Sequence, residues 1–162
     1  MKVLIAIDGS ENALRALTKF LHLTKSFTDL PSITLISVHD DSPFYGAARF
    51  AGRESVVEYL KGLSVGDLAG AQARLDEWKI PHHVVMAVGE IASTIVRHAD
   101  ENGFDLIVMG SKGRTNLGNL LMGSVATKVL AATDKPVLLV GEPERETRAR
   151  AEHQSQPEAL QT

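Results

Sequence analysis

The sequence contains no cysteine among its 162 residues. That absence excludes disulfide scaffolds, thiol chemistry, thiolate zinc sites and iron–sulfur clusters. The chain also has no excess of positive charge, because it contains 17 Lys and Arg and 20 Asp and Glu. This charge balance argues against a nucleic-acid partner. No apolar run reaches the ~18 residues of a membrane-spanning helix, and the short apolar start does not fit a signal peptide. We therefore expect a cytoplasmic protein with neither a membrane nor a nucleic-acid partner.

What the chain does contain is an alternation of short apolar runs with helical patterns. The apolar runs are typical of strands buried on both faces, and they predict strands at 3–7, 33–38, 82–88, 106–109 and 136–140. Apolar residues at helical spacing predict helices after Ser10, over 53–78, from 90 to near 102, and over 124–132. Strands that alternate with helices form parallel sheets covered on both faces, so the sequence predicts a doubly wound α/β fold.

Three segments depart from this regular pattern. Residues 39–52 are typical of a loop, and Gly62, Gly66 and Gly70 predict a bend or break in the helix over 53–78. From residue 145 onward, Leu160 is the single large aliphatic residue and there is no aromatic one, so this part cannot bury enough apolar surface to order itself. We expect one domain over 1–141, followed by a polar, disordered tail over 142–162.

The most informative segment follows the fourth predicted strand. It places four glycines in fourteen positions before a helix N-terminus: Gly110, Gly113, Gly118 and Gly123. Glycines let backbone amides approach a ligand closely, and a helix N-terminus offers free N–H donors to an anion. Lys112 and Arg114 add positive charge, and Thr115 and Ser124 add hydroxyl donors. The segment predicts a phosphate site, although glycines that serve only tight turns would give the same composition.

Two familiar phosphate-binding motifs are absent from this chain. The pattern G-x-x-x-x-G-K-[ST] does not occur, because Ser124 follows Gly123 with no lysine between them. The pattern G-x-G-x-x-G is missing after the first strand, where Gly9 stands alone. These absences argue against a P-loop NTPase and against a dinucleotide-binding domain.

The glycines nevertheless have a recognisable spacing. Gly110, Gly113, Gly123 and Ser124 form the pattern G-x2-G-x9-G-[ST], which resembles the nucleotide-binding signature of the universal stress protein family. The flanking segments 105–111 and 136–140, the opening 5–10 and the segment 88–90 are also similar to that family. The resemblance implies a Rossmann-like sheet of five parallel strands in the order 3-2-1-4-5, ATP binding, and a homodimer that pairs through the last strand.

The resemblance also implies a set of nucleotide-binding residues. Ala6 and Asp8 would lie beside the nucleotide at the end of the first strand, where Asp8 would meet the ribose or a phosphate-bound metal. The adenine would contact the backbone of Val38. The remaining residues would border the ribose (Met109 and Gly110) or hold the phosphates (Gly113, Arg114, Gly123, Ser124 and Val125). The expected ligand is ATP, or AMP or ADP, in some cases with Mg²⁺.

Several residues near these strand ends allow two interpretations. Asp8 could be only a turn residue, since Asp-Gly is a strong turn signal. His39, Asp40 and Asp41 could ligate Mg²⁺ or could simply begin a solvated loop, and the second interpretation is the one we favour. The residues of the 39–52 loop could also form a lid, with Arg49 and Arg53 over the phosphates and with Phe44, Tyr45 and Phe50 over the base.

These observations predict a nucleotide-binding regulatory or stress-response module with no assigned catalytic residue. The alternative is a weak ATPase or a nucleotidyl-transferring enzyme on the same fold, which would depend on Asp8 or on residues 39–41. Neither a nucleophile motif nor a positioned pair of carboxylates is evident in the chain, so any hydrolysis should be slow. An interaction module that binds no nucleotide is a third possibility, and the intact glycine spacing disfavours it.

Overall fold

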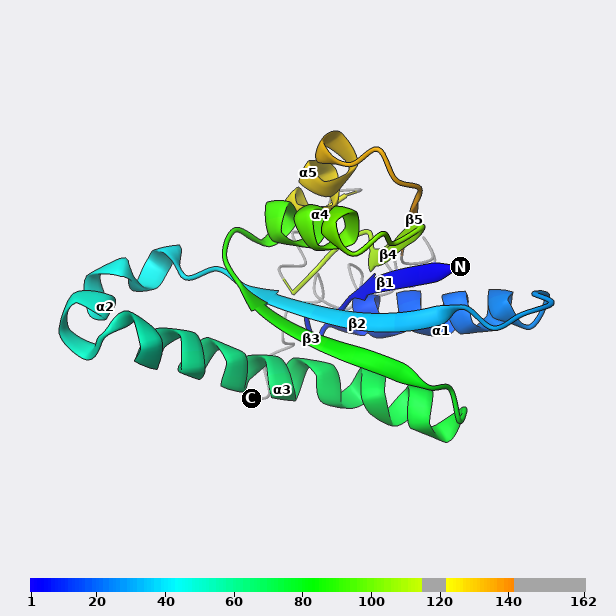
Figure 1. The fold of residues 1–162 in the computed structure, drawn as a ribbon, viewed down its shortest axis with the longest axis horizontal. Helices are drawn as coiled ribbons and strands as arrows, with labels where there is room; N and C mark the ends of the chain where they lie inside the picture. The colour runs from blue at the N-terminus through cyan, green and yellow to red at the C-terminus, as the bar shows by residue number, and fades with distance from the viewer. Residues whose placement is uncertain (115–121, 142–162) are drawn as a thin grey trace, which may run out of the picture.

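A computed structural model describes residues 1–114 and 122–141, which form a five-stranded parallel sheet covered by helices on both faces (Figure 1). The strands are β1 (Lys2–Ala6), β2 (Ser32–His39), β3 (His82–Val88), β4 (Leu106–Gly110) and β5 (Val137–Val140). Their order is β3-β2-β1-β4-β5, and every neighbouring pair is parallel. The predicted fold class and strand order are therefore confirmed.

The apolar runs of the strands supply two cores, one on each face of the sheet. Alternate residues of β1 point to opposite faces, so Val3 and Ile5 belong to one core and Leu4 to the other. The first core packs against α1 (Glu11–Thr24) and α3 (Arg53–Glu77), and the second packs against α4 (Ile91–Glu101) and α5 (Ser124–Ala132). Burial on both faces explains why these strands are continuously apolar rather than alternating.

The residue that precedes a helix decides whether a side chain accepts hydrogen bonds from the first amides of that helix. Ser10 caps α1, and its hydroxyl accepts a hydrogen bond from the Ala13 amide at 3.2 Å. Glu90 caps α4, and its carboxylate accepts from the Ser93 amide at 2.8 Å. The residue before α5 is Gly123, which has no side chain to act as a cap. The N-terminus of α5 is therefore open to an external acceptor.

The prediction of a loop over 39–52 is wrong. The segment contains the 3₁₀ turn η1 (Ser42–Phe44) and the short helix α2 (Tyr45–Ala51). Pro43 lies in the first turn of η1, where its missing N–H would have had no helical partner. Alanine is frequent in α2, and it is the residue with the highest helix propensity.

The helix over 53–78, which was expected to bend or break near its glycines, is not interrupted in the structure. α3 runs for 25 residues through Gly62, Gly66 and Gly70. Each glycine costs roughly 1 kcal/mol relative to alanine. Leu60, Leu68 and other residues of the same face are fully buried, and burial of one such leucine is worth about 2 kcal/mol or more. Packing therefore outweighs the weak intrinsic propensity of the segment.

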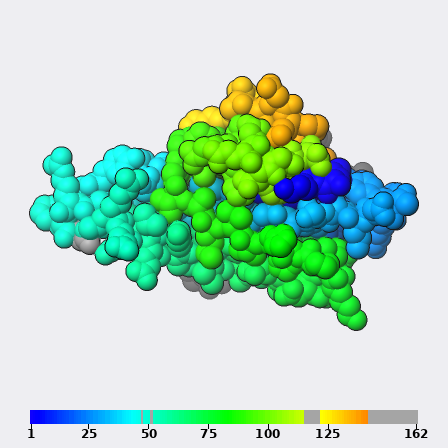
Figure 2. Space-filling view, viewed as in Figure 1, coloured from blue at the N-terminus to red at the C-terminus, as the bar shows by residue number. Residues whose placement is uncertain are grey.

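α2 and the first turns of α3 reach beyond the carboxyl ends of the strands (Figure 1). The space-filling view shows the same segment projecting from the body of the molecule (Figure 2). No helix within residues 1–114 and 122–141 is both long and apolar enough to cross a membrane. Thr115, Gly118 and the predicted tail over 142–162 lie outside the described residues.

Candidate functional site

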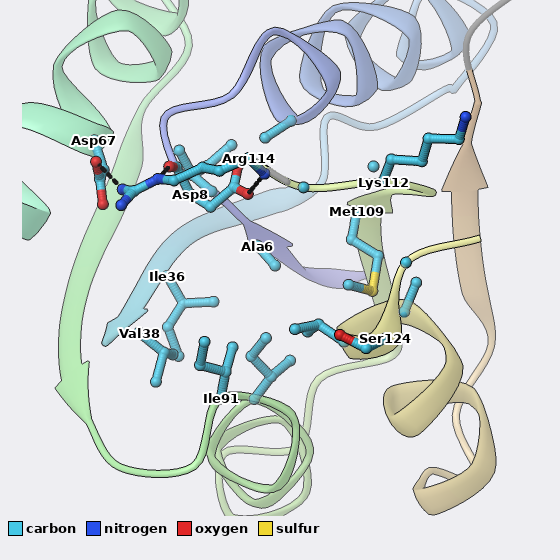
Figure 3. A pocket seen from close by; sticks show the side chains of 18 of the residues that line it. Ala6, Asp8, Ile36, Val38, Asp67, Ile91, Met109, Lys112, Arg114 and Ser124 are labelled. Carbon is cyan, nitrogen blue, oxygen red and sulfur yellow. Dashed lines mark hydrogen bonds and ion pairs between the residues drawn. The ribbon is translucent and has the colours of Figure 1, made fainter. Parts of the chain in front are cut away.

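A pocket opens at the carboxyl ends of the central strands, where β1 lies between β2 and β4 (Figure 3). This is the point at which the strand order reverses, and open α/β sheets bind their ligands there. The pocket encloses about 240 Å³. All ten residues predicted from the sequence line it: Ala6, Asp8, Val38, Met109, Gly110, Gly113, Arg114, Gly123, Ser124 and Val125. The fold thus brings together four segments that are far apart in the chain.

The glycine-rich loop after β4 is held tightly against the turn after β1. The Arg114 amide donates to Oδ2 of Asp8 at 3.2 Å. A Cβ atom on Gly113 would lie 2.7 Å from the same oxygen, so only glycine allows this approach. On the other side, the Gly123 amide donates to the Ser111 carbonyl at 2.7 Å. The two described ends of the loop, at Gly113–Arg114 and at Gly123, are therefore fixed by contacts with Asp8 and with Ser111.

The N-terminus of α5 forms one of those walls. Its first intrahelical bond runs from the Thr127 amide to the Gly123 carbonyl, at 3.0 Å. The amides of Ser124, Val125 and Ala126 precede that bond and have no acceptor within the helix. All three residues line the pocket, so the positive end of the helix dipole faces it. Such an arrangement suits a phosphate or another anion.

The opposite part of the pocket is apolar. Ile36 and Val38 of β2 gather with Ile91 of α4 on the side of the sheet that α4 and α5 cover (Figure 3). Ile95 and Met109 complete this surface. Sequence reasoning missed Ile36, Ile91 and Ile95, because their spacing is equally typical of core residues. Together they can accept a flat apolar group beside the anion site.

A charged part of the pocket lies on the α3 side, and it centres on Asp67. Arg114 forms an ion pair with Asp67 (Figure 3). His39 Nε2 lies 2.9 Å from Asp67 Oδ2. Sequence reasoning did not find Asp67. The available signal was weak: Asp67 directly precedes the buried Leu68, so it borders the inward face of α3. Nothing in the local sequence indicated which segment would lie opposite it.

Asp8 and the residues of the 39–41 cluster differ in their hydrogen-bond and ion-pair partners. Asp8 Oδ1 accepts from the Ser10 amide at 3.0 Å, so Asp8 is a turn residue as well as part of the pocket lining. His39 lines the pocket. The Asp40 carboxylate accepts a hydrogen bond from the Ser42 amide at 2.8 Å, and Oδ2 of Asp41 lies 3.9 Å from the Arg53 guanidinium. Among the residues with described placement, no three His, Asp or Glu side chains converge on one point as a metal site requires.

The residues expected to form a lid lie elsewhere in this structure. Phe44, Tyr45 and Arg53 line a second cavity between α2 and α3. The Phe44 ring packs edge-on against Tyr59, with ring centres 6.0 Å apart. Phe50 is 94% exposed. The hypothesis that these side chains cover the pocket therefore finds no support in this structure.

One ion pair joins the two helices that wall the pocket. Lys128 of α5 lies 3.0 Å from the carboxylate of Glu90, the cap of α4. The Ser93 backbone amide, and after it the Lys128 ammonium, lower the pKa of Glu90 from 4.5 to about 2. Glu90 is thus ionised at neutral pH and links the start of α4 to α5.

The pocket and the glycine spacing agree with a comparison against known families. Residues 1–141 match the profile of the Universal stress protein family. The chain belongs to this family. It is 35% identical over 145 residues to the universal stress protein MJ0531 of Methanocaldococcus jannaschii, a match that covers 90% of this chain and 84% of that protein.

Solved structures of universal stress proteins and their relatives share the fold. The structure of protein MJ0577, also from M. jannaschii, superposes with a TM-score of 0.74 at 28% identity, over 88% of this chain and 96% of that one. A universal stress protein of Arabidopsis thaliana, solved with AMP bound, superposes with a TM-score of 0.62 over 90% of this chain and 94% of that one. Its identity is 17%, so this second likeness concerns the fold alone.

Proposed function

We propose that this universal stress protein binds an adenine nucleotide (ATP, ADP or AMP) and acts as a cytoplasmic regulatory module in a stress response. The carrying observation is the composition of the pocket, in which an apolar surface stands beside an open helix N-terminus. An adenine nucleotide has the same division, since a flat base is joined through ribose to an anion. The Arabidopsis protein solved with AMP supports the proposal, because it has the same fold.

The residues present fit each part of such a ligand. Adenine would lie against Val38 and its apolar neighbours, and ribose beside Asp8, Met109 and Gly110. Phosphate would lie at the open backbone amides of the first turn of α5, beside Gly113 and Gly123 of the glycine loop. Lys112 also lines the pocket and adds positive charge. Mg²⁺ would be bound together with the phosphates.

We propose binding rather than turnover. The alternative of a weak ATPase or nucleotidyl transferase requires a carboxylate at Asp8 or in the 39–41 cluster that is free to act on a substrate. Both oxygens of Asp8 accept hydrogen bonds, from the Ser10 amide and from the Arg114 amide. Asp40 and Asp41 are engaged at the start of η1. The favoured role is therefore a switch in which occupancy of the pocket changes the surface offered to a partner.

The substitution Gly123→Val tests the proposal by filling the space beside the open amides. The backbone of Gly123 has φ −76° and ψ 158°, which valine adopts readily, and a Cβ there would lie in van der Waals contact with the loop backbone, 3.4 Å from the Ser111 carbonyl oxygen. We expect calorimetric titration with ATP and with AMP to detect binding to the wild-type protein, and affinity to fall at least about tenfold in Gly123→Val.

Gly62→Val is the matched control, because nothing lies within 4 Å of a Cβ at that helical position. It should bind nucleotide like the wild-type protein, and thermal melts should show both variants folded. Absence of binding by the wild-type protein at millimolar nucleotide, or unchanged affinity in Gly123→Val, would overturn the proposal.

A further inference from the structure

Asp67 is the residue of α3 that lines the pocket. Its side chain is 14% exposed and packs against the turn after β1, where a Cβ on Gly9 would lie 2.8 Å from Oδ1 of Asp67. Oδ2 of Asp67 lies 2.9 Å from His39 Nε2 and 3.5 Å from the Ser37 hydroxyl. Asp67 is thus fixed in place by β2 and by the first turn.

Arg114 is drawn to this fixed carboxylate. Its guanidinium pairs with Oδ1 of Asp67, and its Nε donates to the backbone carbonyl of Asp8. Figure 3 shows the arginine side chain extended toward α3, away from Ser124 at the start of α5. The cation that the family resemblance places at the phosphates is therefore held on the other side of the pocket.

This pairing changes the charge that the pocket offers to a ligand. Its lining contains two carboxylates, Asp8 and Asp67, and two permanent cations, Lys112 and Arg114. With Arg114 paired to Asp67, the groups left for an anion are the backbone amides of α5 and the side chain of Lys112. Amides at a helix N-terminus suffice for a single phosphate group. A triphosphate carries more negative charge and needs cations as well.

Arg114 can still be released, at a cost. The Arg114 side chain is 51% exposed, so its guanidinium can turn toward a ligand through solvent. Asp67 would keep His39 and Ser37 as neighbours after that change. A triphosphate that recruits Arg114 must break the ion pair, whereas a monophosphate held by amides leaves the pair intact.

We propose that Asp67 is a specificity-determining residue that makes the pocket favour a nucleoside monophosphate over a nucleoside triphosphate. This inference rests on the proposed function, since it assigns a preference to the same site. Asp67 acts by holding Arg114 against α3, so that each added phosphate must compete with a protein carboxylate for the guanidinium.

The test compares the ratio of ATP to AMP affinity in Asp67→Asn and in the wild-type protein, by calorimetry in EDTA so that Mg²⁺ supplies no charge. We expect Asp67→Asn to bind ATP about fivefold more tightly, as expected for the loss of one competing ion pair, and AMP within about twofold of the wild-type protein. Asp67→Ser serves as a second uncharged variant, and melts establish which variants are folded.

Asp76→Asn is the matched control, because it removes the same charge from an exposed position of α3 and should leave both affinities unchanged. In an Arg114→Gln background, Asp67→Asn should no longer alter the ratio. An unchanged ratio, or an equal loss for both nucleotides, would overturn the inference alone. Failure of the wild-type protein to bind either nucleotide would overturn the proposed function, and this inference with it.

Discussion

Two carboxylates shape the pocket through their contacts with glycine. Asp67 lies against Gly9, whose φ of 78° falls in the left-handed region, and Asp8 lies against Gly113. At both positions a Cβ would come within 3 Å of a carboxylate oxygen. A side chain at Gly9 would therefore separate the turn after β1 from α3. A side chain at Gly113 would separate the same turn from the glycine loop.

The Glu90 carboxylate gives a prediction at the same scale. Its pKa in the folded protein is about 2, below the usual 4.5, so its stabilising effect is fully present above pH 4.5 and is lost as the pH falls through 2. The side chains of Glu90 and Lys128 are 47% and 63% exposed, so solvent screens the pair, and we expect Glu90→Gln to lower the free energy of unfolding by about 1 kcal/mol at pH 7.

Urea unfolding at pH 7, pH 4 and pH 3 measures this effect. The difference between wild-type protein and Glu90→Gln should shrink toward the lowest pH, because the carboxyl group of the unfolded chain, with a pKa near 4.5, takes up its proton before that of the folded protein. Glu58→Gln, at an exposed position of α3, should show no comparable difference. A difference that stays constant with pH would mean that ionisation of Glu90 contributes nothing to stability.

At the scale of the element, α3 combines a buried inward face with glycines at exposed positions. Leu68 and Leu75 pack its inward face against the sheet, and Leu60 is buried as well. Gly62 and Gly66 point outward, and nothing lies within 4 Å of a Cβ built at either position. Gly70 differs, because the Leu14 side chain is 3.4 Å from its Cβ position.

We expect Gly62→Ala and Gly66→Ala each to raise the free energy of unfolding by about 0.5–1 kcal/mol, because alanine restricts the unfolded chain and favours the helix. Gly70→Ala should gain less, since Leu14 must shift. Urea denaturation of the three variants gives the comparison. A loss of stability at Gly62 or Gly66 would contradict the open surroundings of these positions.

At the scale of the whole molecule, β5 is an edge of the sheet. The Ile107 amide donates to the Pro136 carbonyl and the Ser111 amide to the Val140 carbonyl, so the alternate residue Leu139 turns its backbone groups outward. An outward row of unpaired amides can pair with a second strand. We propose that two copies of the chain associate through this edge.

Leu139→Pro tests the dimer, because proline removes an outward N–H and leaves the bonds to β4 in place. We expect the variant to sediment as a monomer and the wild-type protein as a dimer. The Leu139 side chain also packs on the core beneath α4 and α5, so Leu139→Ala is the control that loses the packing and keeps the amide. A dimeric Leu139→Pro protein would exclude β5 as the contact.

Much of this architecture was predictable because local signals agreed with each other. The strand over 82–88 and the helix over 124–132 have the predicted bounds, since apolar runs and flanking turn residues specify both ends. The segment over 39–52 was predicted wrongly because its loop-like features, Pro43 and two glycines, hid a helical run of alanines. α3 was expected to bend or break because helix propensity is local, whereas the burial that keeps the helix continuous involves residues remote in the chain.

The sequence by itself determined the fold class and, through the family resemblance, the strand order and ten of the residues that line the pocket. It could do so because buried parallel strands and glycine-rich turns impose patterns on neighbouring residues. Only the tertiary structure decided that Asp67 meets Arg114 and His39, that Ile36 and Ile91 face the pocket, and that the aromatic residues of α2 do not. These contacts join segments that are remote in the chain, and their partners are chosen by the packing of α3 and α4 on the sheet, which no local pattern of residues encodes.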